Sequence, residues 1–171
     1  MSKVFNEDDA HHDLFKPVKD WIINGNGRMV VGGTKYDEEL AHFKRMRRLF
    51  ILLRQAGKII RLSPEDCARV DELADTLKEK EPAPDFDDPH IVALLVVSGC
   101  LIVCTYETRA IPYFKRTEWY RNAQCVPKVY GRNSKARAKQ ILCCRNIADI
   151  CKPNVKLTKE QVGAIEASKG M

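Results

Sequence analysis

Long hydrophobic runs are missing from this 171-residue sequence. The longest clear apolar run covers residues 91–97, whereas a membrane-spanning helix needs roughly 18 or more such residues. The amino-terminal residues also lack the apolar centre of a secretory signal peptide. A composition that is 44% hydrophobic and 30% charged excludes collagen-like, repetitive and disordered chains. We therefore expect a soluble, cytoplasmic protein with one ordinary domain.

Motifs of several common enzyme classes are also missing. The glycines at positions 25, 27, 32 and 33 fit neither the Walker phosphate loop nor the GxGxxG fingerprint, which disfavours nucleotide-dependent chemistry. No G-x-S-x-G motif supports a serine hydrolase. The seven cysteines form no C-x-x-C pair and are odd in number. We expect reduced thiols, mostly in the core, rather than zinc ligands or a complete disulfide framework.

The charge is distributed unevenly along the chain. The overall net charge is +6, but residues 1–108 carry −4 and the remaining residues carry +10. A basic segment beside a more acidic body suggests a polyanionic partner such as nucleic acid. An excess of solvated lysines and arginines that only aids solubility is an equally good interpretation of the charge alone.

Apolar periodicity and capping residues predict alternating helices and strands. The predicted helices cover residues 14–23, 34–55, 64–80, 89–97 and 135–151, with a weaker one from Thr158, and the predicted strands cover residues 28–31, 58–62, 100–105 and 126–130. This order is typical of a parallel sheet with helices on both sides. Because the strand over 100–105 is apolar almost throughout, we expect it to be central and covered on both faces.

Acidic residues at the ends of these elements are the best candidates for chemistry. Asp87 and Asp88 precede a helix, Glu38 and Glu39 lie in the second turn of the long helix, and Glu107 follows a strand. Carboxylates that converge at the carboxyl edge of a parallel sheet would be neutralised by Mg²⁺ or Mn²⁺. Each acid also has an ordinary interpretation as a helix cap or a surface residue. The four histidines, at positions 11, 12, 42 and 90, are scattered and are interpreted as surface or cap residues.

A family resemblance emerges from two segments. In the second half, Asp87-Asp88-Pro89-His90-Ile91-Val92-Ala93-Leu94 is followed by Ser98-Gly99, an apolar strand, Thr105-Tyr106-Glu107 and Phe114-Lys115. In the first half, Asp13-Leu14-Phe15-Lys16-Pro17-Val18 precedes Trp21-Ile22, Gly32-Gly33 and Glu39-Leu40. Both segments resemble the PIN-domain nucleases, in particular a toxin-like bacterial and archaeal branch, and Val129-Tyr130 resembles the end of that domain.

The resemblance implies an α/β protein with a three-layer α/β/α fold and a parallel sheet. The PIN-like domain would cover residues 1–130, followed by a basic helical extension over residues 131–171. The family hydrolyses RNA with Mg²⁺ or Mn²⁺ held by about four acids, and many members are toxins paired with an antitoxin protein. The implied partners are therefore RNA and a cognate antitoxin, and a homodimer is a further assembly to expect.

Transferred by motif, the resemblance implies that Glu39, Asp88 and Glu107 are the catalytic acids and that Asp87 joins them as metal ligands. Glu107 stands where the family usually has an aspartate. The family's first strand, with the aspartate that ends it, has no counterpart here. We therefore expect reduced metal affinity and turnover, unless Asp8, Asp9 or Asp87 takes the place of that aspartate.

Basic residues fit RNA binding as well. The candidates for phosphate contacts are Lys44, Arg45, Arg47, Arg48, Arg121, Lys128, Arg132, Lys135 and Arg137. Aromatic side chains among the later ones, at positions 113, 119, 120 and 130, are candidates for stacking on bases, although ordinary core aromatics are the competing interpretation. Three hypotheses remain open: a metal-dependent endoribonuclease, a degenerate module that binds RNA or protein without cutting, and a structural interaction protein built on the basic extension.

Overall fold

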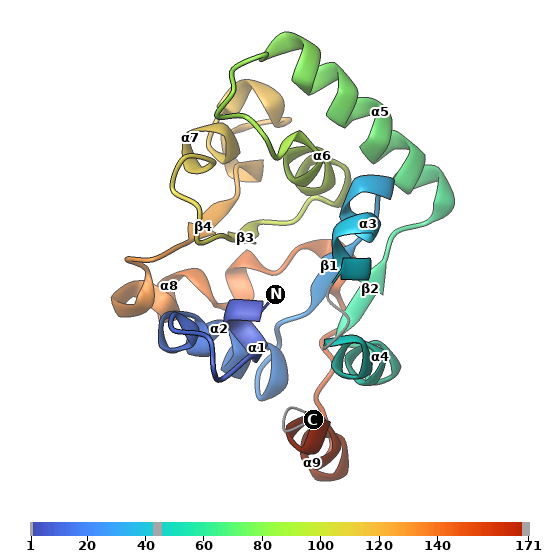
Figure 1. Ribbon diagram of the computed structural model, residues 1–171, viewed down its shortest axis with the longest axis vertical. Helices are drawn as coiled ribbons and strands as arrows, with labels where there is room; N and C mark the ends of the chain where they lie inside the picture. Colours follow the sequence, from blue (N-terminus) through green and yellow to red (C-terminus); the bar gives the residue numbers. More distant parts are fainter. Residues whose placement is uncertain (1, 43–45, 169–171) are drawn as a thin grey trace.

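Two short parallel sheets and the helices around them make up the computed structural model, which describes residues 2–42 and 46–168 (Figure 1). The strands are β1 (Met29–Val31), β2 (Ile59–Arg61), β3 (Ile102–Cys104) and β4 (Lys128–Tyr130). The α-helices are α1 (Ser2–Phe5), α2 (His12–Ile23), α3 (Thr34–His42), α4 (Arg47–Gln55), α5 (Pro64–Lys80), α6 (Pro89–Ser98), α7 (Ile111–Phe114), α8 (Ala138–Ile141) and α9 (Lys159–Ala167). The prediction of a mixed α/β protein with parallel strand pairing is confirmed.

Each sheet has two strands in the described part of the chain. In one sheet Val30 of β1 lies opposite Ile60 of β2, and in the other Val103 of β3 lies opposite Val129 of β4. The prediction of a central strand over residues 100–105 is wrong, because β3 pairs with β4 alone among the described strands. Its other edge faces an apolar cavity of about 240 Å³, which residues of β1 and β3 line together.

Strands β1 and β3 belong to different sheets and line the same cavity. At their amino ends, Nη1 of Arg28 lies 3.3 Å from the carbonyl oxygen of Cys151, and Cys100 packs in the same small apolar cluster as Cys151. Beyond their carboxyl ends, Glu39 and Glu107 both act electrostatically on Asp88. The two sheets therefore present their carboxyl ends to one common region, while the cavity keeps them apart.

Local sequence explains why the helices near that region form. Ser63 begins α5 as predicted, because its hydroxyl accepts a hydrogen bond from the amide of Asp66 at 3.1 Å and Pro64 occupies the first turn. Helix α6 is apolar on nearly every side and is largely buried. It ends at Gly99, which adopts the left-handed conformation, with φ of 66°, that glycine reaches without strain.

Two predicted helices differ from the observed elements. The helix predicted over residues 34–55 is described as α3 and α4, which lie on either side of residues 43–45. The helix predicted over residues 135–151 is wrong as a continuous element: it is a short 3-10 turn, the four-residue α8, and two further 3-10 turns. At the end of α8 the side-chain amide of Asn146 donates to the carbonyl oxygens of Gln140 and Ile141, which takes the place of the next helical turn.

The carboxyl-terminal segment packs on the rest of the chain. Ile141 of α8 and Ile165 of α9 belong to the same buried cluster as Phe15 and Val18 of α2. Helix α9, predicted to begin after Thr158, is confirmed and starts with a capping box between Thr158 and Gln161. Among the described helices, none is both long enough and apolar enough to cross a membrane.

Candidate metal centre

Three side chains from two helices meet at the carboxyl ends of the strands. Glu39 comes from α3, Asp88 immediately precedes α6, and His90 lies in the first turn of α6. One ligand atom of each residue lies within 4.8 Å of the others, and no other such group occurs in residues 2–42 and 46–168. Carboxylate oxygens and an imidazole nitrogen at this spacing could hold a metal ion.

Helix α3 is fixed in place by contacts at its first turn. The Asp71 carboxylate on α5 accepts hydrogen bonds from the amide and the hydroxyl of Thr34, at 2.8 and 2.7 Å. Gly33, just before them, has φ of 90°, and a Cβ atom there would lie 2.7 Å from Cγ1 of Val70. Asp37 forms an ion pair with Arg61 at the end of β2. These contacts position Glu39 together with Tyr36 of α3, which packs against both large hydrophobic clusters.

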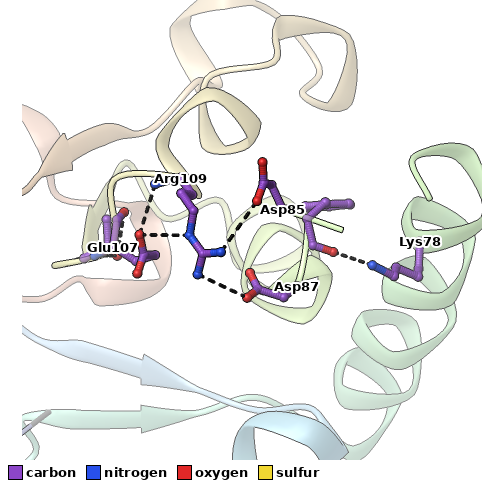
Figure 2. A network of polar contacts seen from close by, with 7 residues as sticks. Lys78, Asp85, Asp87, Glu107 and Arg109 are labelled. Carbon is purple, nitrogen blue, oxygen red and sulfur yellow. Dashed lines mark hydrogen bonds and ion pairs between the residues drawn. The ribbon is translucent and has the colours of Figure 1, made fainter. Parts of the chain in front are cut away.

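The segment before Asp88 is anchored by Phe86. This side chain is 2% exposed and stacks on the rings of Tyr113 and Trp119, with centroids 4.6 and 5.0 Å away. Its carbonyl oxygen accepts a hydrogen bond from Nζ of Lys78 on α5 at 2.6 Å, which Figure 2 shows at the right of the network. Asp88 is therefore held where the loop enters α6.

Asp88 does not serve as a helix cap. It occupies the N-cap position of α6, but its carboxylate accepts no capping hydrogen bond. Burial raises the pKa of Asp88 above its usual range, the nearby His90 lowers it, and the carboxylates of Asp87, Glu39 and Glu107 raise it further. A half-buried carboxylate that is kept near other acids and freed from capping is a typical cation ligand.

His90 is the residue that sequence reasoning missed. The interpretation of this histidine as a surface or cap residue is wrong, because its side chain is 5% exposed. Its Nε2 atom is buried and has no hydrogen-bond partner. The Oε1 atom of Glu39 lies 3.3 Å from Nε2, but the approach lacks hydrogen-bond geometry, so we describe the pair as a close contact. The only available signal was position, since His90 lies two residues after Asp88 at the start of an apolar helix.

Glu107 and Asp87 lie beside this group without joining it. Figure 2 shows Arg109 between Glu107 on one side and Asp85 and Asp87 on the other. Oε1 of Glu107 accepts hydrogen bonds from the amide and Nε of Arg109 at 3.3 and 3.4 Å, and Oδ2 of Asp87 lies 4.0 Å from Nη2. These hydrogen bonds lower the pKa of Glu107. Asp8 and Asp9, at the turn before α2, are also outside the group.

The predicted RNA-binding residues are mostly exposed. Lys44 and Arg45 lie outside the described residues, and the exposed members are Arg47, Arg48, Arg121, Lys128, Arg132, Lys135 and Arg137. Arg132 packs over the ring of Tyr106 at 3.9 Å and is close enough to Glu107 to lower its pKa. The idea that Tyr120 and Tyr130 stack on bases is wrong, because both are buried and their hydroxyls donate to the carbonyls of Phe114 and Leu14.

Comparisons with known proteins identified no relative of this chain. No model of a known family matches the chain, and searches of the curated proteins and of the solved structures found no significant match. The evidence for function is therefore the geometry of Glu39, Asp88 and His90 at the carboxyl ends of the strands.

Proposed function

We propose that this protein is a metal-dependent hydrolase that cleaves RNA phosphodiesters, with a PIN-like arrangement of its strands. The observation that carries the proposal is the convergence of Glu39, Asp88 and His90 within 4.8 Å, with Asp88 free of any capping role. Carboxylates from separate elements that meet at the carboxyl ends of parallel strands are a typical hydrolase site.

The strand arrangement supports a PIN-like fold. β1 and β3 line one apolar cavity, and each pairs in parallel with one other described strand. Two parallel strand pairs beside a shared cavity are compatible with one parallel sheet that lacks a strand in its middle. Helices α5 and α6 lie on one side of these strands, while α2 and α8 lie on the other (Figure 1).

The residues of the site would have different roles. Glu39 and Asp88 supply negative oxygens and His90 supplies a nitrogen, so the three would hold a divalent ion, Mg²⁺ or Mn²⁺ in the PIN family. When bound, such an ion provides an activated water and neutralises charge that develops on the phosphate. Arg132, beside Glu107, would attract the phosphate backbone.

The exposed basic residues favour contacts with many RNA sequences. Phosphate contacts from arginine and lysine carry no base information, so binding would be tolerant of sequence and would weaken steeply as salt rises. By the same resemblance, a cognate antitoxin protein is the proposed regulatory partner.

Cleavage of structured RNA in the presence of Mn²⁺ tests this function. We expect the full chain to cleave RNA, EDTA to stop cleavage, and the Asp88→Asn variant to lose at least 100-fold in rate. The matched control is Asp75→Asn, which neutralises an exposed acid on α5 that takes no part in the metal group. Metal-independent cleavage, or full cleavage by Asp88→Asn, would contradict the proposal.

A module that binds RNA or protein without cutting is the second candidate. It is favoured by Arg109, which forms ion pairs with Glu107 and Asp87. The metal group then consists of two carboxylates and one imidazole. RNA binding that persists in EDTA, with no metal-dependent cleavage by the wild-type chain, would support this module over the hydrolase.

A further inference from the structure

We propose that Nε2 of His90 is a direct ligand of the divalent ion, and that this nitrogen makes the site select transition-metal ions such as Mn²⁺ and Co²⁺ over Mg²⁺. The inference rests on the metal site of the proposed function and adds to it the class of metal. The site inferred from the sequence resemblance contained only carboxylates, so a nitrogen ligand changes the chemistry of the centre.

The first observation is the unsatisfied nitrogen itself. Nε2 of His90 is buried and makes no hydrogen bond. A buried polar atom without a partner costs free energy, and nearly all such atoms in folded proteins are paired with protein or water groups. A metal ion between His90, Glu39 and Asp88 would satisfy this atom, and it would also remove the repulsion between the two carboxylates.

The second observation is the short distance between the imidazole and Glu39. Nε2 lies 3.3 Å from Oε1 of Glu39, close enough for contact but without the alignment of a hydrogen bond. Atoms that share a metal ion are neighbours of this kind, because each directs its lone pair at the ion and not at the other ligand. Both His90 and Asp88 are held by the start of α6, so the two ligands are fixed relative to one another.

The ligand set determines which ions fit. Mg²⁺ prefers oxygen ligands and gives up its water reluctantly, whereas imidazole nitrogen suits first-row transition metals. Affinity for nitrogen-containing sites rises from Mn²⁺ through Co²⁺ to Cu²⁺ and is lower again for Zn²⁺. Three protein ligands also leave positions for water, which is the arrangement of catalytic rather than structural centres.

The test measures metal binding without RNA. Metal-free full-length protein is titrated with Mg²⁺, Mn²⁺ and Co²⁺ by calorimetry, and the Mn²⁺ complex is examined by pulsed electron paramagnetic resonance for coupling to an imidazole nitrogen. We expect Mn²⁺ and Co²⁺ to bind at least tenfold more tightly than Mg²⁺, and a nitrogen coupling in the wild-type complex. Equal affinity for all three ions, or no nitrogen coupling, overturns the proposal.

Two variants separate ligation from folding. His90→Gln replaces the nitrogen with an amide oxygen, so we expect a loss of at least tenfold in Co²⁺ affinity and little change for Mg²⁺. His42→Gln is the control, because His42 is an exposed histidine on the same helix as Glu39. If His90→Gln fails to fold, the nitrogen coupling in the wild-type protein still decides the question.

The outcome does not depend on RNA cleavage. A protein that binds Mn²⁺ through His90 but leaves RNA intact would refute the hydrolase and retain the metal assignment. Cleavage that is as fast with Mg²⁺ as with Mn²⁺, and as fast in His90→Gln as in wild type, would refute the ligand role of His90 and retain the hydrolase.

Discussion

Arg109 holds the Glu107 carboxylate at the edge of the candidate metal centre through two hydrogen bonds to Oε1, one from its amide and one from its guanidinium (Figure 2). The same guanidinium lies near Asp85 and Asp87. A positive charge at this position competes with a bound cation for the surrounding acids. The arrangement explains why Glu107, which the sequence places beside the site, lies outside the group formed by Glu39, Asp88 and His90.

Replacing Arg109 by glutamine should therefore strengthen metal binding. We expect about a two- to fivefold gain in Mn²⁺ affinity, as is typical for removal of one exposed charge interaction, measured by calorimetry. The pKa of Glu107 should rise towards its usual value of 4.5, which a carboxyl-carbon NMR titration would follow. Arg109→Lys, which retains the charge, is the control and should stay close to wild type. An unchanged affinity in Arg109→Gln would show that Arg109 does not compete with the ion.

The pH dependence of this pair follows from the direction of the shift. Because the folded state lowers the pKa of Glu107, the ionised pair stabilises the fold above the usual carboxyl pKa. That contribution disappears as the pH falls through the lowered pKa. Arg109→Gln should lack this part of the acid dependence, which urea unfolding at several acidic pH values would detect.

Asp88→Asn should stabilise the metal-free protein while it removes metal binding. The pKa of Asp88 is raised, chiefly by burial, so its ionised form destabilises the fold at neutral pH. We expect a gain of about 0.5–2 kcal/mol in urea unfolding at pH 7, and the gain should shrink as acid protonates Asp88 in the wild-type chain. Mn²⁺ should raise the unfolding temperature of wild type and not that of Asp88→Asn. A destabilised variant would contradict this account.

The contact between Asp71 and Thr34 should control both stability and the position of Glu39. Asp71→Ala removes the acceptor of two hydrogen bonds at the start of α3, so we expect a loss of about 1–2 kcal/mol in the free energy of unfolding. Mn²⁺ affinity should fall as well, because α3 carries Glu39. Asp71→Asn retains one carbonyl oxygen as an acceptor and should lose less than Asp71→Ala. Equal effects of the two substitutions would show that the hydrogen bonds are not the cause.

Local signals in the sequence identified most elements that position the site. Ser63 followed by Pro64 predicts the start of α5, and Asp88 followed by Pro89 predicts the start of α6, because such signals depend on neighbouring residues alone. Ser63 caps its helix as expected, whereas Asp88 occupies the N-cap position without the capping hydrogen bond. The cysteine-flanked apolar run predicts β3 in the same way. Its place at the edge of the cavity was not predictable, because strand neighbours depend on contacts between residues far apart in the chain.

In the candidate site, too, local features of the sequence are predictable and contacts between distant residues are not. Glu39 and Asp88 were identified because each lies near the start of a predicted helix and matches a motif of the PIN-domain resemblance, and the structure brings their carboxylates together. His90 was not identified, since burial of a single histidine depends on how α6 packs and leaves no periodic signal. The pairing of Glu107 with Arg109 was also hidden, because two nearby charges of opposite sign are common on ordinary surfaces.

Lys58 provides a pH-dependent test of the packing around β1. Its side chain is fully buried, and Nζ donates to the carbonyl oxygens of Gly25 and Gly27 at 2.8 and 3.4 Å. Burial, with a further effect of Arg28, lowers the pKa of Lys58 from 10.5 to about 8. Below that value the folded state must keep an ammonium group in a dry environment, so the charged lysine opposes folding at pH 7.

The contribution of Lys58 to the free energy of unfolding should therefore become more favourable as the pH rises. Between about pH 8 and 10.5 the folded chain releases the Lys58 proton while the unfolded chain retains it, so a rise in pH favours the folded state. Over this whole range the free energy of unfolding should increase by an amount on the order of 3 kcal/mol. Tyrosines with raised pKa values, such as Tyr36 and Tyr130, oppose this trend at alkaline pH. The difference between wild type and Lys58→Met in urea unfolding isolates Lys58, and it should move in favour of wild type from pH 7 to pH 10. A difference that stays constant over this range would mean that Lys58 keeps its ordinary pKa in the folded protein.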